Sequence, residues 1–144
     1  MVTSKVLASY HMVLPFVLAI IKNSKGEALI GQDSDSKRKP YSLFWNLPGG
    51  KLEKNETVEE CLKREIFEEL SVKVKSSKLI GVFHHSGRSI LKECTSKLPG
   101  LGICYEVKVV GKVKSTERDS IHFASRKELK SLRLTPWARY FLGI

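Results

Sequence analysis

A glycine-containing turn that leads straight into a strongly patterned helix is the feature that most constrains this chain. The turn is LPGG at residues 47–50, where glycine permits backbone conformations that other residues avoid. Thr57 is a predicted helix N-cap, and Glu60 three residues later completes a capping box. Apolar residues then recur at every fourth position and predict the buried ridge of the helix: Val58, Leu62, Ile66 and Leu70.

The acidic residues are concentrated in the same part of the chain. The 144 residues include 25 Lys+Arg and 15 Asp+Glu, a formal net charge of +10. Residues 53–69 nevertheless hold seven glutamates against three basic residues, so this stretch carries −4 and the rest of the chain +14. The basic excess favours a polyanionic partner, which can be nucleic acid, a phosphorylated small molecule or an acidic membrane surface.

Composition restricts the class of protein. Hydrophobic residues make up 42% of the chain, which excludes intrinsic disorder and fits one folded domain over residues 1–144. No apolar run approaches the ~20 residues that cross a bilayer, so we expect no membrane-bound protein. The three cysteines lack metal-ligand spacing and favour a reduced, cytoplasmic protein, with a Cys94–Cys104 pair as the alternative.

Three glutamates of the predicted helix share one face. Glu65, Glu68 and Glu69 stand at positions i, i+3 and i+4, where like charges repel one another. They also lie in the C-terminal half of the helix, where the helix dipole disfavours anions. Two interpretations follow: a solvated acidic face, or a set of hard oxygen ligands for Mg²⁺ or Mn²⁺.

The context of these glutamates favours the second interpretation. The segment 50–72 (GKLEKNETVEECLKREIFEELSV) resembles the Nudix box, G-x5-E-x7-R-E-U-x-E-E-x-G-U, in which U is a bulky aliphatic residue. Ser71 stands where the pattern has glycine; that glycine is expected to end the helix in a left-handed conformation, which serine would strain modestly. The matching positions are Gly50, Glu56, Arg64, Glu65, Ile66, Glu68, Glu69 and Val72.

The resemblance implies a fold and a set of site residues. The fold would be α/β, a Nudix-type α/β/α sandwich around a mixed β-sheet. Glu68 and Glu69 would be the principal ligands of Mg²⁺ or Mn²⁺, and Glu65 a further ligand or the base that activates water. The backbone carbonyl of Gly49 would complete the metal shell, and Arg64 would pair with Glu56.

The remaining sequence predicts further elements. Residues 14–22 and Ala28–Gln32 have the pattern of two strands joined as a hairpin by the turn at 23–26. Residues 78–84 and 102–110 are further predicted strands, residues 126–132 a short helix, and residues 137–142 a last helix after Pro136, packed through Trp137. Residues 33–41 and 86–100 are predicted loops that can shape a substrate pocket.

Several polar residues are candidates for substrate binding. His84, His85 and Arg88 follow a predicted strand, where they could meet phosphates or a base. Lys37, Arg38 and Lys39 could hold a triphosphate tail, although a solvated loop is the simpler explanation for them. Many Nudix proteins supply another acid from a later loop, for which the candidates here are Glu93, Glu106, Glu117 and Asp119. Ser120 stands where that acid is often found, which shifts the role of base toward Glu65.

The resemblance implies hydrolysis of a nucleoside diphosphate linked to another moiety. Markers of ADP-ribose, diadenosine-polyphosphate and NADH hydrolases are missing downstream of the box, so our leading prediction is a (d)NTP pyrophosphatase that releases the nucleoside monophosphate. ADP-ribose or nucleotide-sugar hydrolysis and RNA 5′-end hydrolysis are the alternatives, and the sequence pI of about 9.6 favours the RNA option. A non-catalytic nucleotide-binding module is a further alternative. Monomer and homodimer both stay open.

Overall fold

A mixed four-stranded sheet forms the centre of the molecule in the computed structural model, which describes residues 13–32, 43–85, 99–114 and 120–144. Its strand order is β3-β1-β5-β4. Strands β1 and β5 are parallel, and the β1–β3 and β4–β5 pairs are antiparallel. The strand bounds are β1 Leu14–Ile20, β3 Gly49–Lys51, β4 Lys73–His85 and β5 Gly100–Val110.

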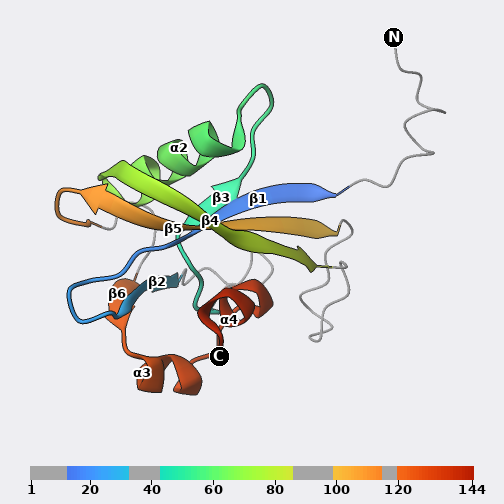
Figure 1. Cartoon of the computed structure of the whole chain (residues 1–144). Coiled ribbons are helices and arrows are strands. Elements are labelled where there is room, and N and C mark those ends of the chain that lie inside the picture. Colours follow the sequence, from blue (N-terminus) through green and yellow to red (C-terminus); the bar gives the residue numbers. More distant parts are fainter. Residues whose placement is uncertain (1–12, 33–42, 86–98, 115–119) are drawn as a thin grey trace, which may run out of the picture.

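Helices lie on both sides of this sheet (Figure 1). Helix α2, Val58–Leu70, covers one face, while α3, Arg126–Ser131, and α4, Pro136–Leu142, lie on the other side. A second, two-stranded antiparallel sheet of β2, Ala28–Gln32, and β6, Ser120–Ala124, lies on the same side as α3 and α4. This arrangement confirms the predicted fold class.

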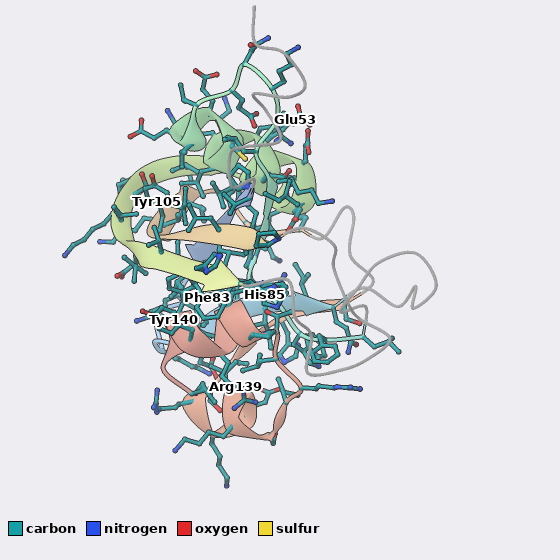
Figure 2. All side chains as sticks on the ribbon, turned by 90° about the vertical axis from the view of Figure 1, so that its right-hand side faces the viewer. Glu53, Phe83, His85, Tyr105, Arg139 and Tyr140 are labelled. Carbon is teal, nitrogen blue, oxygen red and sulfur yellow. The ribbon has the colours of Figure 1, made fainter. Side chains whose placement is uncertain are left out.

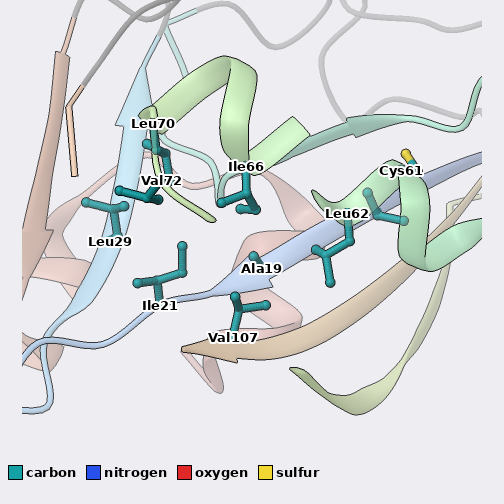
Figure 3. Packing of buried hydrophobic residues seen from close by; sticks show 10 residues of the cluster. Ala19, Ile21, Leu29, Cys61, Leu62, Ile66, Leu70, Val72 and Val107 are labelled. Carbon is teal, nitrogen blue, oxygen red and sulfur yellow. The ribbon is translucent and has the colours of Figure 1, made fainter. Parts of the chain in front are cut away.

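Strand β1 separates two hydrophobic clusters because its alternate side chains point to opposite faces of the sheet. Val17 and Ala19 belong to the cluster beneath α2, which also contains Leu62, Ile66, Leu70 and Val107 (Figure 3). Leu18 and Ile20 belong to the other cluster, with Ile30, Leu129, Leu134 and Ala138. The strand is therefore buried on both faces.

Helix α2 follows its predicted pattern closely. The Thr57 hydroxyl accepts a hydrogen bond from the backbone N–H of Glu60 at 3.1 Å, which confirms the N-cap. Leu62, Ile66 and Leu70 are at most 1% exposed, as the apolar ridge requires. Ser71 ends the helix in the left-handed conformation with φ 56° and ψ 33°, so the strain expected of a serine at this position is present.

The predicted hairpin of β1 and β2 is present only around its turn. The Gly26 N–H donates to the Asn23 carbonyl at 3.0 Å, Lys22 pairs antiparallel with Ala28, and the Leu29 N–H donates to the Ile21 carbonyl at 2.8 Å. Beyond these residues the two strands separate into different sheets. The reason is that β1 is apolar on both faces and occupies a central position between β3 and β5. Strand β2 pairs with β6 instead.

Other boundaries differ in smaller ways. The predicted LPGG turn runs into the short strand β3, and the sequence did not predict β6. Strand β4 begins at Lys73 and not at residue 78, because a bulge between Val74 and Ser76 interrupts the alternation there. Gly100, predicted to end a loop, opens β5. The two C-terminal helices agree with their predictions to within one residue. Within the described ranges, none of the helices is long and apolar enough to cross a bilayer.

Candidate active site

Arg64 is the centre of a hydrogen-bonded group of acids on α2 and the loop before it. Its Nε and Nη2 atoms donate to Glu56 Oε2 and Oε1 at 2.6 and 3.0 Å, a bidentate pair. Its Nη1 atom donates to Glu65 Oε1 at 2.8 Å and to Glu68 Oε2 at 3.2 Å. One guanidinium therefore offsets the repulsion among these glutamates. The predicted Arg64–Glu56 pair is present.

The bidentate pair changes the acidity of both partners. The hydrogen bonds from Arg64 lower the pKa of Glu56 from 4.5 to about 2. The hydrogen bond to Glu56 raises the pKa of Arg64 further above its ordinary value. Both side chains are largely covered, at 11% exposure for Glu56 and 22% for Arg64. The loop before α2 is thus fixed to the helix by an ion pair that stays charged throughout the physiological pH range.

Strand β3 brings backbone close to this acidic face. Gly49 pairs with Leu18 of β1 at φ 151°, and a side chain at Gly49 would collide with the carbonyl of Val17. A Cβ at Gly50 would collide with the carboxylate of Glu65. Gly49 therefore requires glycine, and Gly50 leaves room for the Glu65 carboxylate beside the turn.

The carboxylates of α2 differ in exposure. Glu69 is only 5% exposed, whereas the Glu68 side chain is 43% exposed and that of Glu65 12%. In the part of the chain that the structure describes, no three His, Cys, Asp or Glu side chains are gathered as a ready metal site. The donor chemistry nevertheless fits Mg²⁺ or Mn²⁺, because hard carboxylate oxygens lie one helical turn apart beside a turn cleared of side chains.

Cys61 belongs to the same group, which the sequence did not predict. Its Sγ lies 3.4 Å from the Lys51 carbonyl oxygen and 3.7 Å from Arg64 Nη2. Burial raises the pKa of this thiol to about 12, so it stays protonated and can donate to Lys51. Its position three residues before Arg64 on the helix is the signal that could have identified it.

The two predicted histidines lie at the end of β4 but point to opposite faces of the sheet. His85 contacts Trp137 of α4 edge-on, with ring centroids 5.5 Å apart, while His84 is exposed. Burial, followed by the charge of His84, lowers the pKa of His85. Figure 2 shows His85 and Phe83 toward α4, away from the loop that carries Glu53. The structure therefore does not bring the two histidines into one pair.

Trp137 has the packing role that the sequence predicted, and it also donates a hydrogen bond. Its Nε1 atom donates to Asn46 Oδ1 at 2.9 Å, and the Thr135 hydroxyl donates to the same oxygen at 3.1 Å. Trp137 also meets Phe16 edge-on, with ring centroids 5.3 Å apart. The contact joins residues 91 positions apart, so no local sequence pattern could predict Asn46.

The other predicted site residues are placed as follows. Glu106, a candidate loop acid, lies on β5 directly opposite Lys78. Cys104 is a buried free thiol, and Cys94, its predicted alternative partner, lies outside the described residues. Outside the described residues lie the remaining candidates, Lys37, Arg38, Lys39, Arg88, Glu93, Glu117 and Asp119.

Comparison with protein families identifies one match over most of the chain. The model described as the NUDIX domain matches residues 12–142. Among curated proteins, an "8-oxo-dGTP diphosphatase" from Proteus vulgaris is 48% identical over 42 residues, 29% of this chain and 38% of that protein. A "MutT-like protein" from Streptomyces ambofaciens is 43% identical over 47 residues, 33% of this chain and 30% of that protein. The chain thus spans about a third of the length of these curated relatives.

Solved structures resemble the chain over nearly its whole length. A MutT NUDIX hydrolase from Burkholderia pseudomallei has a TM-score of 0.78 at 23% identity and covers 92% of this chain and 98% of its own. A MutT protein from Methanosarcina mazei Go1 has a TM-score of 0.75 at 25% identity and covers 92% of both chains. The E. coli ORF135 protein has a TM-score of 0.73 at 22% identity, covering 92% and 88%. These similarities support the observed fold.

Proposed function

Because the chain belongs to the Nudix family, whose members are pyrophosphohydrolases, we propose that it is a metal-dependent enzyme of this kind. Its substrate class is a nucleoside diphosphate linked to another moiety. The observation that carries this proposal is the acidic face of α2, where Arg64 orders Glu56 and Glu65 beside the Gly49–Gly50 turn. A non-catalytic binding module would have no need for glutamates ordered in this way.

The proposed chemistry assigns a role to each of these residues. The carboxylates of Glu68 and Glu69 and the backbone carbonyl of Gly49 would hold Mg²⁺ or Mn²⁺, and Glu65 would serve as the base. When bound, such an ion neutralises the diphosphate and acidifies a water molecule. Glu65 accepts the proton of the attacking water, and Arg64 orients Glu65 through its Nη1 hydrogen bond. The water attacks one phosphorus in line and the other phosphate leaves with the electrons of the broken P–O bond.

We further propose that the substrate is a (d)NTP and that the products are the nucleoside monophosphate and pyrophosphate. The missing markers of other Nudix subfamilies support this choice, as does the name of the Proteus vulgaris relative. Substrate contacts would come from Arg88, Lys37, Arg38 and Asp119 and from one of the two histidines, because His84 and His85 point to opposite faces of β4. ADP-ribose or nucleotide sugars and RNA 5′ ends are the alternative substrates. The buried free thiols Cys61 and Cys104 support a cytoplasmic location.

A nucleotide panel tests this proposal. The purified chain is incubated with (d)NTPs, 8-oxo-dGTP, ADP-ribose, nucleotide sugars and 5′-triphosphorylated RNA in Mg²⁺ or Mn²⁺, and orthophosphate and pyrophosphate release are followed separately. We expect pyrophosphate and the monophosphate from a (d)NTP, and no product in EDTA. Release of orthophosphate alone from (d)NTPs would contradict the substrate assignment. Hydrolysis that persists in EDTA would contradict the proposed dependence on metal.

A further inference from the structure

Four large apolar side chains are exposed together around strand β4. Leu79, Ile80 and Val82 of this strand are 56%, 44% and 54% exposed, and Tyr140 of α4 is 59% exposed. Tyr140 packs against Phe83 of β4, with ring centroids 5.0 Å apart (Figure 2), which places it beside the same strand. We call Leu79, Ile80, Val82 and Tyr140 the β4 patch.

The β4 patch surrounds an open edge of the central sheet. Strand β4 is the last in the order β3-β1-β5-β4, and in the described ranges no strand pairs with its outer edge. Leu79 lies opposite Tyr105, which packs against the cluster beneath α2, so Leu79 is on the α2 face. Phe83 contacts Tyr140 on the other face, and Val82 next to it points back to the α2 face because side chains alternate along a strand. Apolar surface therefore continues around the edge from one face of the sheet to the other.

Irregularities in β4 limit how another chain can approach this edge. The pairing register of β4 shifts between Val74 and Ser76 and again between Leu79 and Gly81. Bulges and lysines are the features by which natural sheets prevent continuous pairing along an open edge. A long strand from another chain would therefore not form a regular ladder along β4, whereas side-chain packing over the patch needs no such ladder.

The charges of β4 are separated along its length. Lys73, Lys75 and Lys78 lie in its first part, and residues 79–85 contain no Asp, Glu, Lys or Arg. A two-fold axis through the patch at Ile80 would run two copies of β4 antiparallel. The two copies of Lys78, the lysine nearest the axis, would then be roughly 14 Å apart along the strands, beyond the Debye length of ~10 Å at 0.1 M salt. Lys78 also lies opposite Glu106, so a second copy can cover the patch without bringing unbalanced like charges together.

The exposed area of the patch indicates how strong such a contact can be. Exposed fractions of 44% to 59% amount to roughly 400 Å² over the four side chains, a size at which a contiguous apolar patch on a monomer is often functional. A standard interface buries about 800 Å² on each partner, so the patch supplies about half of that area and its neighbours the rest. A contact of this size is expected to be weak and to depend on protein concentration.

We propose that a second copy of this chain covers the β4 patch, forming a two-fold symmetric homodimer with Ile80 next to the axis. Leu79 and Val82 pack against their counterparts on the α2 side of the two sheets, and Tyr140 packs against its counterpart on the α4 side. A two-fold contact needs a surface that is complementary to itself, and an uncharged apolar patch meets this condition. An acidic partner would be drawn to the lysines of β4 and not to the patch. This inference goes beyond the proposed hydrolysis and does not depend on it.

Sedimentation equilibrium of the full chain tests the inference. Over about 5 to 500 µM protein, we expect the average mass to rise from 16.3 kDa toward twice that value. Leu79→Lys should raise the dimer Kd at least about 10-fold, because its ammonium group would be buried without a partner. The matched variant Phe67→Lys adds the same charge at a residue of α2 outside the patch and should leave Kd unchanged within about 2-fold. Both side chains are more than half exposed, so both variants should keep the circular dichroism spectrum of the unmodified chain.

Disulfide crosslinking tests the position of the axis. A residue next to a two-fold axis lies close to its own counterpart, within reach of a disulfide. In a Cys94→Ser background, where Cys61 and Cys104 are buried, oxidised Ile80→Cys should form a covalent dimer and Phe67→Cys should not. A monomer at every concentration, equal Kd values in the two lysine variants, or equal crosslinking of the two cysteine variants would overturn the proposal.

Discussion

The two flanks of α2 differ in how their charges are held. On one flank, Arg64 bonds to Glu56, Glu65 and Glu68 at 2.6 to 3.2 Å, and the side chains of Glu56 and Glu65 are only 11% and 12% exposed. On the other flank, Lys63 and Lys75 are exposed side chains at a groove. Chemistry at a phosphorus needs fixed positions, whereas attraction of a polyanion needs only charge. We therefore expect catalysis on the ordered flank.

Replacing Arg64 should produce the largest difference in activity between variants of the two flanks. Arg64→Lys keeps the positive charge but removes the bidentate fork that holds Glu56 and the bond to Glu65. We expect kcat/KM for the identified nucleotide to fall about 10- to 100-fold. The matched variant Lys63→Arg, one residue away on the other flank, should change kcat/KM less than 2-fold. Similar losses of kcat/KM in both variants would show that activity does not depend on the hydrogen bonds of Arg64.

The pH dependence of stability tests the Arg64–Glu56 ion pair in the absence of substrate. Because Arg64 holds the pKa of Glu56 near 2, below its ordinary 4.5, the charged carboxylate favours the folded state. Its contribution is fully present above pH 4.5 and is lost as the pH falls through about 2. We expect the urea midpoints of the unmodified chain and of Glu56→Gln to differ by a constant amount above pH 5 and to converge toward pH 2. A difference that stays constant to pH 2 would exclude the ion pair as its cause.

A smaller effect, on stability, is expected at the C-terminal end of α2, which is common to both flanks. Ser71 holds a left-handed conformation that glycine adopts without strain. Ser71→Gly should raise the free energy of unfolding by about 1 kcal/mol, or Tm by roughly 2–4 °C. Ser131→Gly is the control, since residue 131 is the last residue of α3 and glycine should lower stability there by about 0.5–1 kcal/mol. Loss of stability in Ser71→Gly would contradict the interpretation of Ser71 as a strained cap.

Local patterns predicted the elements whose causes are local. The Thr57 N-cap, the apolar ridge and the left-handed end at Ser71 all depend on interactions within a few residues, and all three are present. The Arg64–Glu56 pair was predictable because the box motif implies it. The sequence did not predict pairing that is non-local: β1 runs beside β5, some 85 residues later, and the predicted hairpin with β2 is limited to the residues around its turn.

The candidate site shows the same limit. Cys61 was identifiable from its helical spacing to Arg64, but Asn46 was not, because its partners Thr135 and Trp137 come from the other end of the chain. His84 and His85 looked like a tandem pair, yet the alternation of a strand sends them to opposite faces. Two residues are thus expected on the same face of a helix when they are three or four positions apart, and on the same face of a strand when they are two positions apart.

The most direct test of the account compares two glutamates of α2. Glu69 is 5% exposed on the flank assigned to catalysis, and Glu60 is exposed in the first turn of the same helix. Glu69→Gln and Glu60→Gln each remove one negative charge, so metal-dependent hydrolysis and the circular dichroism spectrum are measured for both. We predict that Glu69→Gln lowers kcat at least 1000-fold (roughly 4 kcal/mol of activation free energy) without changing the fold, while Glu60→Gln retains full activity. Full activity in Glu69→Gln would contradict the assignment of catalysis to this flank.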